Sequence, residues 1–170
     1  MVVIPEVRTE RLILRAAREE DFETMKDYLS RDRTKFIGGP HNELETWRVL
    51  LNMLGHWHLK GYGLWQIEHR TTGRLAGSVG FFNPFDWPEP ELGWNVHHDF
   101  EGQGIAYEAA LAARAFGESA LGLKQVVSFI VPENTRSAAL AHRLGATVEK
   151  RMAIRGTECD VYRHPKPEAA

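Results

Sequence analysis

The sequence predicts a single α/β domain built on a mixed β-sheet. Three observations support this class. The chain has 170 residues, the length of one domain, and its 43% hydrophobic and 26% charged content is typical of globular proteins. Strand-like and helix-like segments follow one another in the order β-α-α-β-β-β-α-β-α-β-β. Because no repeat or linker interrupts this order, we expect residues 1–170 to form one domain with a frayed tail at 165–170.

The first segments are a strand and two helices. Residues 11–17 alternate leucines with other side chains, as a strand does. Acidic residues at 19–21, followed by apolar residues at spacings of three and four, predict a first helix. A second helix is predicted over 44–60 and ends at two glycines. Its expected apolar stripe comprises Trp47, Leu50, Leu51, Leu54 and Trp57.

The remaining segments complete the sheet. Residues 104–121 predict a helix with a narrow face of small side chains that should pack closely on a flat surface. The apolar positions expected on this face are Ile105, Ala109, Ala112, Phe116 and Ala120. Residues 126–131 are mostly apolar and β-branched, which predicts a strand buried on both faces. A short helix is expected at 135–144. Further strands are expected at 64–68, 75–83, 91–96, 147–154 and 158–163, with a tight turn at 71–73.

Composition argues against several classes of function. The 21 basic and 23 acidic residues give a formal net charge of −2 without any long single-sign block, so we expect no nucleic-acid partner. No apolar run is long enough to span a bilayer and the first ten residues do not form a signal peptide, so we expect no membrane association. The single cysteine, Cys159, excludes an internal disulfide and a structural zinc site, which favours a reducing, cytoplasmic compartment.

One turn has the character of a phosphate-binding site. Gly102 and Gly104 lie between a predicted strand and a predicted helix, where backbone can approach a ligand and the first helical N–H groups are unpaired. An ordinary tight turn is the alternative. The turn is not a dinucleotide fingerprint, because Tyr107 occupies the place of its last small residue, and no P-loop sequence is present.

Three separated segments accompany this turn: residues 9–15 with Glu20 and Asp21, residues 91–94 followed by 102–109, and residues 134–145. In these segments the sequence resembles the GCN5-related N-acetyltransferases (GNAT family), and within them the RimJ/RimL-type branch of ribosomal-protein N-terminal alanine acetyltransferases. The resemblance implies a six- to seven-stranded, mostly antiparallel mixed sheet with about four helices. That sheet would splay open between strands 91–96 and 126–131. Analogy with the family also suggests a homodimer.

The resemblance further implies an activity and a binding site. An acetyl group would pass from acetyl-CoA, with no metal, to a primary amine of a protein N-terminus or a small molecule, by direct attack in a ternary complex. Backbone groups of Val96 and His97 would contact the pantetheine arm, and Asn134 would bond near the thioester. The pyrophosphate would rest on the backbone of Gln103, Gly104, Ile105 and Ala106.

Two residues are candidates for catalysis. Glu91 would act as the base, directly or through a water, although a solvated strand-end carboxylate is an equal alternative. Ser137 would protonate the departing thiolate, because Ala141 stands where many relatives carry a tyrosine; a helix N-cap is its alternative role. Glu101 also departs from the family pattern and should add a negative charge near the phosphates.

The acceptor site is expected at residues 36–41, at the second helix around Trp47 and Trp57, and at 81–90. Half of the aromatic rings near this last segment should belong to the core. The pairs His97–His98 and His56–His58 do not have metal-ligand geometry. A non-catalytic acyl-CoA-binding sensor and a nucleotide-binding protein are the rival functions.

Overall fold

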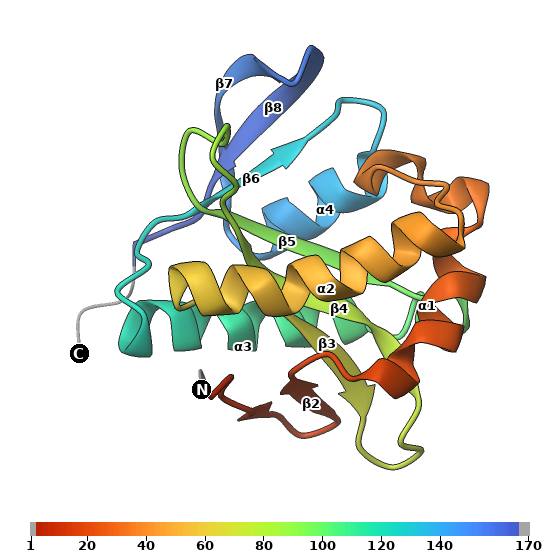
Figure 1. The fold of residues 1–170 in the computed structure, drawn as a ribbon. Coiled ribbons are helices and arrows are strands. Elements are labelled where there is room, and N and C mark those ends of the chain that lie inside the picture. The colour runs from red at the N-terminus through yellow and green to blue at the C-terminus, as the bar shows by residue number, and fades with distance from the viewer. Residues whose placement is uncertain (1–2, 167–170) are drawn as a thin grey trace.

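The computed structural model describes residues 3–166, which form one eight-stranded sheet with helices on both faces (Figure 1). The strands are β1 (Val7–Arg8), β2 (Leu12–Arg15), β3 (Leu64–His69), β4 (Leu75–Phe82), β5 (Glu91–Val96), β6 (Val127–Ile130), β7 (Thr147–Ile154) and β8 (Thr157–Arg163). The α-helices are α1 (Phe22–Leu29), α2 (Glu43–Lys60), α3 (Ile105–Ala120) and α4 (Thr135–Arg143). Short 3-10 helices lie at Glu19–Asp21, Asp32–Ile37 and His98–Phe100.

The strand order is β1-β2-β3-β4-β5-β6-β8-β7, and every neighbouring pair is antiparallel except β5–β6. This confirms the predicted mixed, mostly antiparallel sheet. The structure adds one strand, β1, which has two residues and is too short to produce a recognisable alternation. Of the predicted tail, residues 167–170 lie outside the described residues. None of the helices in residues 3–166 is long and apolar enough to cross a bilayer.

Helix α3 lies against β4 and β5, opposite the face that α1 and α2 cover. Its buried face comprises Ile105, Ala109, Ala110, Ala113 and Gly117. The predicted close packing is confirmed, because a Cβ on Gly117 would lie only 2.3 Å from the ring of Phe81. The predicted face was wrong at two positions: Ala112 is only partly buried and Ala120 is exposed. The buried face includes Ala110 and Ala113 instead.

The expected apolar stripe of α2 is also partly wrong. The helix buries Thr46, Leu50, Met53 and Trp57, which recur at spacings of four, three and four. Leu51 falls off this face and is 48% exposed. The helix begins with a capping box in which Asn42 accepts a hydrogen bond from the Glu45 N–H, a signal present in the sequence.

Strands β5 and β6 are joined only at their beginning. The single paired position is Glu91 with Val127, and the strands diverge beyond it. This is the splay that the family resemblance implies. The gap between the two strands therefore opens toward the end of β5, the end from which the chain continues into α3.

Candidate active site

The β5–β6 ladder is ended by side chains. The Val127 N–H donates to the Pro90 carbonyl, and a parallel ladder continued by two residues would bring the Phe129 N–H to the Leu92 carbonyl. Instead, the Phe129 N–H donates to Glu91 Oε1 at 3.1 Å, and Ser128 Oγ donates to the Leu92 carbonyl at 2.6 Å. The side chains of Glu91 and Ser128 thus satisfy the backbone groups that further pairing would have used. We call this point, where Glu91 and Ser128 separate β5 from β6, the fork.

A buried histidine supports this fork. Ser128 Oγ lies 2.9 Å from Nε2 of His164, and because the Ser128 hydroxyl donates to Leu92, His164 Nε2 must be the donor to Ser128. His164 Nδ1 then faces Arg114 Nη1 at 3.3 Å. Burial, reinforced by the neighbouring arginines, lowers the pKa of His164 to about 4, so the ring is neutral in the fold.

Beyond the fork, backbone groups of β5 point into the gap. The His97 N–H donates to the carbonyl of Ala76 in the adjacent strand β4, at 2.8 Å, which fixes the alternation of the β4–β5 ladder. By that alternation, Trp94 and Val96 direct their N–H and C=O groups away from β4, toward β6. Within residues 3–166 the strand β6 does not pair with either residue. The sequence reading chose Val96 but missed Trp94, which the same alternation could have identified.

The expectation for His97 is not supported. Its N–H is bonded to Ala76, and its carbonyl accepts from the Phe100 N–H at 2.9 Å. Its ring stacks on Tyr28 with centroids 4.2 Å apart. Burial lowers the pKa of His97 to about 4, so this side chain is a neutral part of the wall.

The glycine turn opens helix α3 as expected. Gly102 and Gly104 adopt left-handed φ values of 72° and 75°, and Gly104 is the residue that precedes the helix. In the described chain the first-turn N–H groups, from Ile105 to Tyr107, have no backbone acceptor. Gln103 is exposed, and its side chain is turned back to donate to the Asp99 carbonyl.

The N-terminal segment is hydrogen-bonded to the glycine turn and to the first turns of α3. Glu108 Oε1 accepts from Thr9 Oγ1 at 2.6 Å and from the Arg11 N–H at 3.0 Å. Arg11 Nε donates to Glu108 Oε2 at 2.6 Å, and Arg11 Nη1 donates to the Gln103 carbonyl at 2.8 Å. This network explains physically why residues 9–15 and the glycine turn belong to one site, although about 90 residues separate them in the sequence.

Glu101 does not present an uncompensated charge. It pairs with Arg33 and, at 3.0 Å, with Arg136. Partial burial acts to raise the pKa of Glu101, but hydrogen bonds from the two arginines prevail and hold it below its usual range. The structure therefore corrects the simple expectation of like-charge repulsion, since two cations stand beside the carboxylate.

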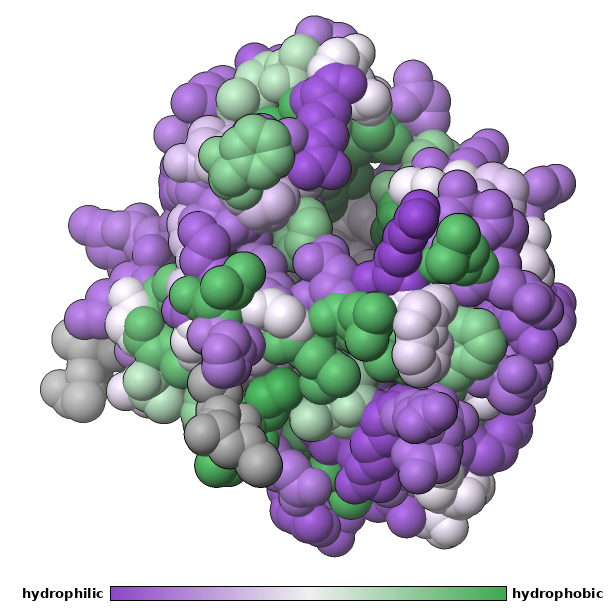
Figure 2. All heavy atoms as spheres, viewed as in Figure 1, coloured by the Kyte–Doolittle hydropathy of each residue, from purple (hydrophilic) through white to green (hydrophobic). Residues whose placement is uncertain are grey.

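A cleft of about 970 Å³ extends from the fork to the α1–α2 layer (Figure 2). Glu91 lies in its floor, with Oε2 accepting from Trp87 Nε1 at 2.8 Å and Oε1 from the Phe129 N–H. Desolvation outweighs these two hydrogen bonds and raises the pKa of Glu91 to about 7. A carboxyl that titrates near neutral pH in a cleft has the properties of a general base.

Asn134 and Ser137 also line this cleft. Asn134 Oδ1 accepts from the Ser137 N–H at 3.2 Å, so Asn134 is the N-cap of α4. The alternative role of Ser137 as the N-cap is therefore wrong. Ala141 is fully buried and packs in a small core with Ile130 and Tyr162.

Comparison with known proteins identifies the fold and the family. Residues 11–147 match the family model described as the acetyltransferase (GNAT) domain. The chain belongs to the GNAT acetyltransferase family. An acetyltransferase structure from Agrobacterium tumefaciens str. C58 is 38% identical, with a TM-score of 0.87 over 96% of this chain and 95% of that one.

Two further proteins are similar to this chain. The [ribosomal protein uS5]-alanine N-acetyltransferase of Escherichia coli is 25% identical, and the alignment covers 84% of this chain and 79% of that enzyme. A structure of RimL, a ribosomal L7/L12 α-N-protein acetyltransferase in complex with coenzyme A, has a TM-score of 0.77 at 20% identity, covering 94% and 96% of the two chains. At that identity the likeness shows the fold.

The residues expected to form the acceptor site do not all line the cleft. Residues 36–38 and His41 line the cleft, but Trp47 packs on Phe22 and Trp57 packs on Trp65. Helix α2 instead presents the side chains of Val49, Asn52, Met53 and His56. Of the five aromatic rings near 81–90, Phe81 belongs to the core and Trp94 packs against the core while also lining the cleft. Phe82 and Trp87 line the cleft, and Phe85 is 96% exposed.

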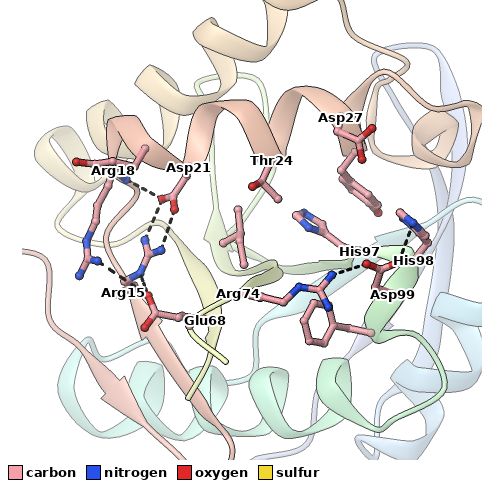
Figure 3. A pocket seen from close by; sticks show the side chains of 15 residues that line it. Arg15, Arg18, Asp21, Thr24, Asp27, Glu68, Arg74, His97, His98 and Asp99 are labelled. Atoms are coloured by element: carbon pink, nitrogen blue, oxygen red, sulfur yellow. Dashed lines mark hydrogen bonds and ion pairs between the residues drawn. The ribbon is translucent and has the colours of Figure 1, made fainter. Parts of the chain in front are cut away.

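A second pocket of about 520 Å³ lies beyond Tyr28 and His97, which border both cavities (Figure 3). Its charged side chains are largely paired with one another. Arg15 forms a bidentate pair with Asp21, and Arg74 pairs with Asp99. Within residues 3–166, no group of three or more His, Cys, Asp or Glu side chains is arranged to hold a metal ion.

Proposed function

We propose that this acetyltransferase transfers the acetyl group of acetyl-CoA to the nitrogen of a primary amine, by direct attack in a ternary complex. The observation that carries the proposal is a path of backbone groups that have no hydrogen-bond partner among residues 3–166. The path runs from the first turn of α3, past Val96 and Trp94, to the carboxyl of Glu91. A splayed sheet is costly unless a ligand supplies hydrogen-bond partners, and a pantetheine arm carries two amides that can do so.

Coenzyme A would be held almost entirely by backbone. The N–H groups of Gly104, Ile105 and Ala106, with that of Gln103, would receive the diphosphate at the positive end of α3. Val96 and Trp94 would bond the arm, in place of the Val96 and His97 pair expected from sequence, because the His97 backbone is already engaged. Asn134 Nδ2 would bond near the thioester while Oδ1 caps α4.

Glu91 would take a proton from the attacking amine, directly or through a water. Its pKa of about 7 keeps a substantial fraction ionised at neutral pH while making it a stronger base than a solvated carboxylate. An α-amino group of pKa about 7.8 costs about 1 kcal/mol to deprotonate at pH 7, whereas a lysine of pKa about 10.4 costs about 4.6 kcal/mol. A protein N-terminus or another amine of low pKa is therefore the acceptor that demands least of this base.

Ser137 would supply the proton to the departing thiolate. Its N–H is used in the cap, but within residues 3–166 no hydrogen bond engages its hydroxyl, which borders the cleft. A hydroxyl is a weak acid, so its contribution would come from position rather than from pKa. Ser137→Ala should lower kcat more than it changes coenzyme A affinity.

The test separates an enzyme from a coenzyme-binding sensor. The protein is mixed with acetyl-CoA and a panel of peptide and small-molecule amines, and free thiol is measured alongside calorimetric binding of coenzyme A and of ATP. We expect binding of coenzyme A and amine-dependent thiol release. Binding without thiol release for any amine would support the sensor, and retention of ATP in place of coenzyme A would support a nucleotide-binding protein.

A further inference from the structure

A row of polar side chains crosses the sheet floor beneath α1 and α2. The strand registers place Arg15 beside Gln66, Gln66 beside Ser78, and Ser78 beside Asn95. Arg15 belongs to the ion-paired cluster of the second pocket (Figure 3). The other three line the main cleft, and we call them the floor row. Gln66 and Ser78 are only 2% and 8% exposed, at positions where a helix-covered sheet usually carries apolar residues.

The floor row has hydrogen-bonding capacity that the fold does not use. Gln66 Nε2 donates to the thioether sulfur of Met25 at 3.0 Å, which is a weak acceptor. Asn95 Nδ2 donates to Ser78 Oγ. In the part of the chain that the structure describes, no donor reaches Gln66 Oε1 or Asn95 Oδ1. Thr46 Oγ1 is the buried side-chain atom without a partner in the described residues, so these two acceptor oxygens are not sealed in the core and belong to side chains that line the cleft. A ligand in the cleft that donates hydrogen bonds can therefore reach them.

The floor row shares its face of β5 with the proposed base. Glu91, Gly93 and Asn95 alternate onto this face, and a Cβ built on Gly93 would meet no atom within 4 Å. The floor is therefore open from Glu91 to Asn95, whose Cα atoms are about 13 Å apart along an extended strand. A molecule whose nitrogen reacts beside Glu91 can extend over Gly93 to the floor row.

We infer that the floor row is the specificity subsite for the acceptor, and that it selects amines carrying neutral hydrogen-bond donors, amide N–H or hydroxyl, beyond the reacting nitrogen. This inference rests on the proposed acetyl transfer. Gln66 Oε1 and Asn95 Oδ1 accept from the acceptor molecule, and the Ser78–Asn95 bond orients the second of these oxygens. An alkyl amine of the same length fills the cleft but leaves both oxygens without partners.

The test compares acceptors that differ only in their donors. The set consists of a short peptide amine, its analogue with ester links in place of amides, a hydroxylated alkyl amine, and an unsubstituted alkyl amine of equal length. Wild type should favour the peptide or the hydroxylated amine by about tenfold or more in kcat/KM over the donor-free partner, the scale of one or two hydrogen bonds. Whichever donor-bearing amine is preferred identifies the source of the donors.

Two variants test the row itself. Gln66→Met conserves volume and should erase most of that preference, through KM, while leaving the alkyl amine rate and the melting temperature undiminished. Ser78→Ala should weaken the preference, whereas the matched control Ser119→Ala, whose hydroxyl bonds only to its own helix, should not. A structural role alone would instead lower stability and reduce all acceptors equally, which would overturn the inference.

Binding keeps this inference separable from the proposed function. The same amines are titrated by calorimetry into the complex with coenzyme A, where no transfer occurs. Tighter binding of donor-bearing amines to wild type than to Gln66→Met supports the floor row even if thiol release is never observed. Equal binding of donor-bearing and donor-free amines refutes it even if the enzyme turns over.

Discussion

The ionisation of Glu91 gives a quantitative prediction. Because desolvation raises its pKa to about 7, about half of the enzyme holds the ionised base at pH 7 and about a tenth at pH 6. With an arylamine acceptor, which stays uncharged across this range, kcat/KM should therefore fall about tenfold per pH unit below 7 and level off above pH 8. An arylamine is used because an alkyl amine would itself be protonated in this range, which would add a second pH dependence to the profile.

Removing the Glu91 carboxylate should lower the rate and also abolish the fall of kcat/KM below pH 7. Glu91→Gln should lower kcat by roughly 10²- to 10⁴-fold, the usual contribution of a general base, and leave a flat pH profile. Glutamine has one acceptor oxygen for two N–H donors, so a stability loss of about 1–3 kcal/mol is also expected. The matched control is Glu89→Gln, whose carboxylate pairs with Arg163 instead of lining the cleft. An arylamine profile that is flat in wild type, or unchanged in Glu91→Gln, would refute the assignment.

Three further predictions concern the fork and the phosphate turn. Ser128→Ala leaves the Leu92 carbonyl without its donor and should cost about 1–3 kcal/mol in urea unfolding; an unchanged midpoint would contradict the fork. His164 has its pKa lowered to about 4 in the fold, so the stability that its neutral ring contributes is complete above the unfolded pKa of 6.5 and is lost as pH falls toward 4. The urea midpoints of wild type and His164→Asn should therefore converge between pH 6.5 and pH 4. Midpoints that change in parallel over this range would contradict the prediction. Glu101→Gln should release Arg136 toward the diphosphate and tighten coenzyme A binding, measured by calorimetry at low salt, whereas weaker binding would show that Glu101 positions the arginine for the ligand.

Local pattern was enough to predict most elements of the fold. Strand alternation and helical spacing located seven of the strands and all four α-helices, because these signals are carried by neighbouring residues. The face of a helix was harder to predict. In α2, Leu51 was chosen as apolar, but the packed face follows Leu50 and Met53, and only tertiary contacts decide between them.

The site was predictable only where its parts are contiguous. The glycine turn was predicted from local pattern, whereas the splay and the choice of Glu91 as the candidate base came from family resemblance. The fork depends on Ser128 meeting Leu92 and His164, each 36 residues away, and no local pattern reveals such a meeting. Trp94 was missed although strand alternation assigns its backbone to the same edge as that of Val96.

The most direct measurement is amide hydrogen exchange with and without coenzyme A, resolved to single residues. The proposed path predicts that the ligand slows exchange at Trp94 and Val96 and in the first turn of α3, at residues 105–107, while His97, already bonded to Ala76, changes little. If coenzyme A binds and leaves the Trp94 and Val96 amides as fast as before, the gap between β5 and β6 is not where the arm lies, and the proposed site is wrong.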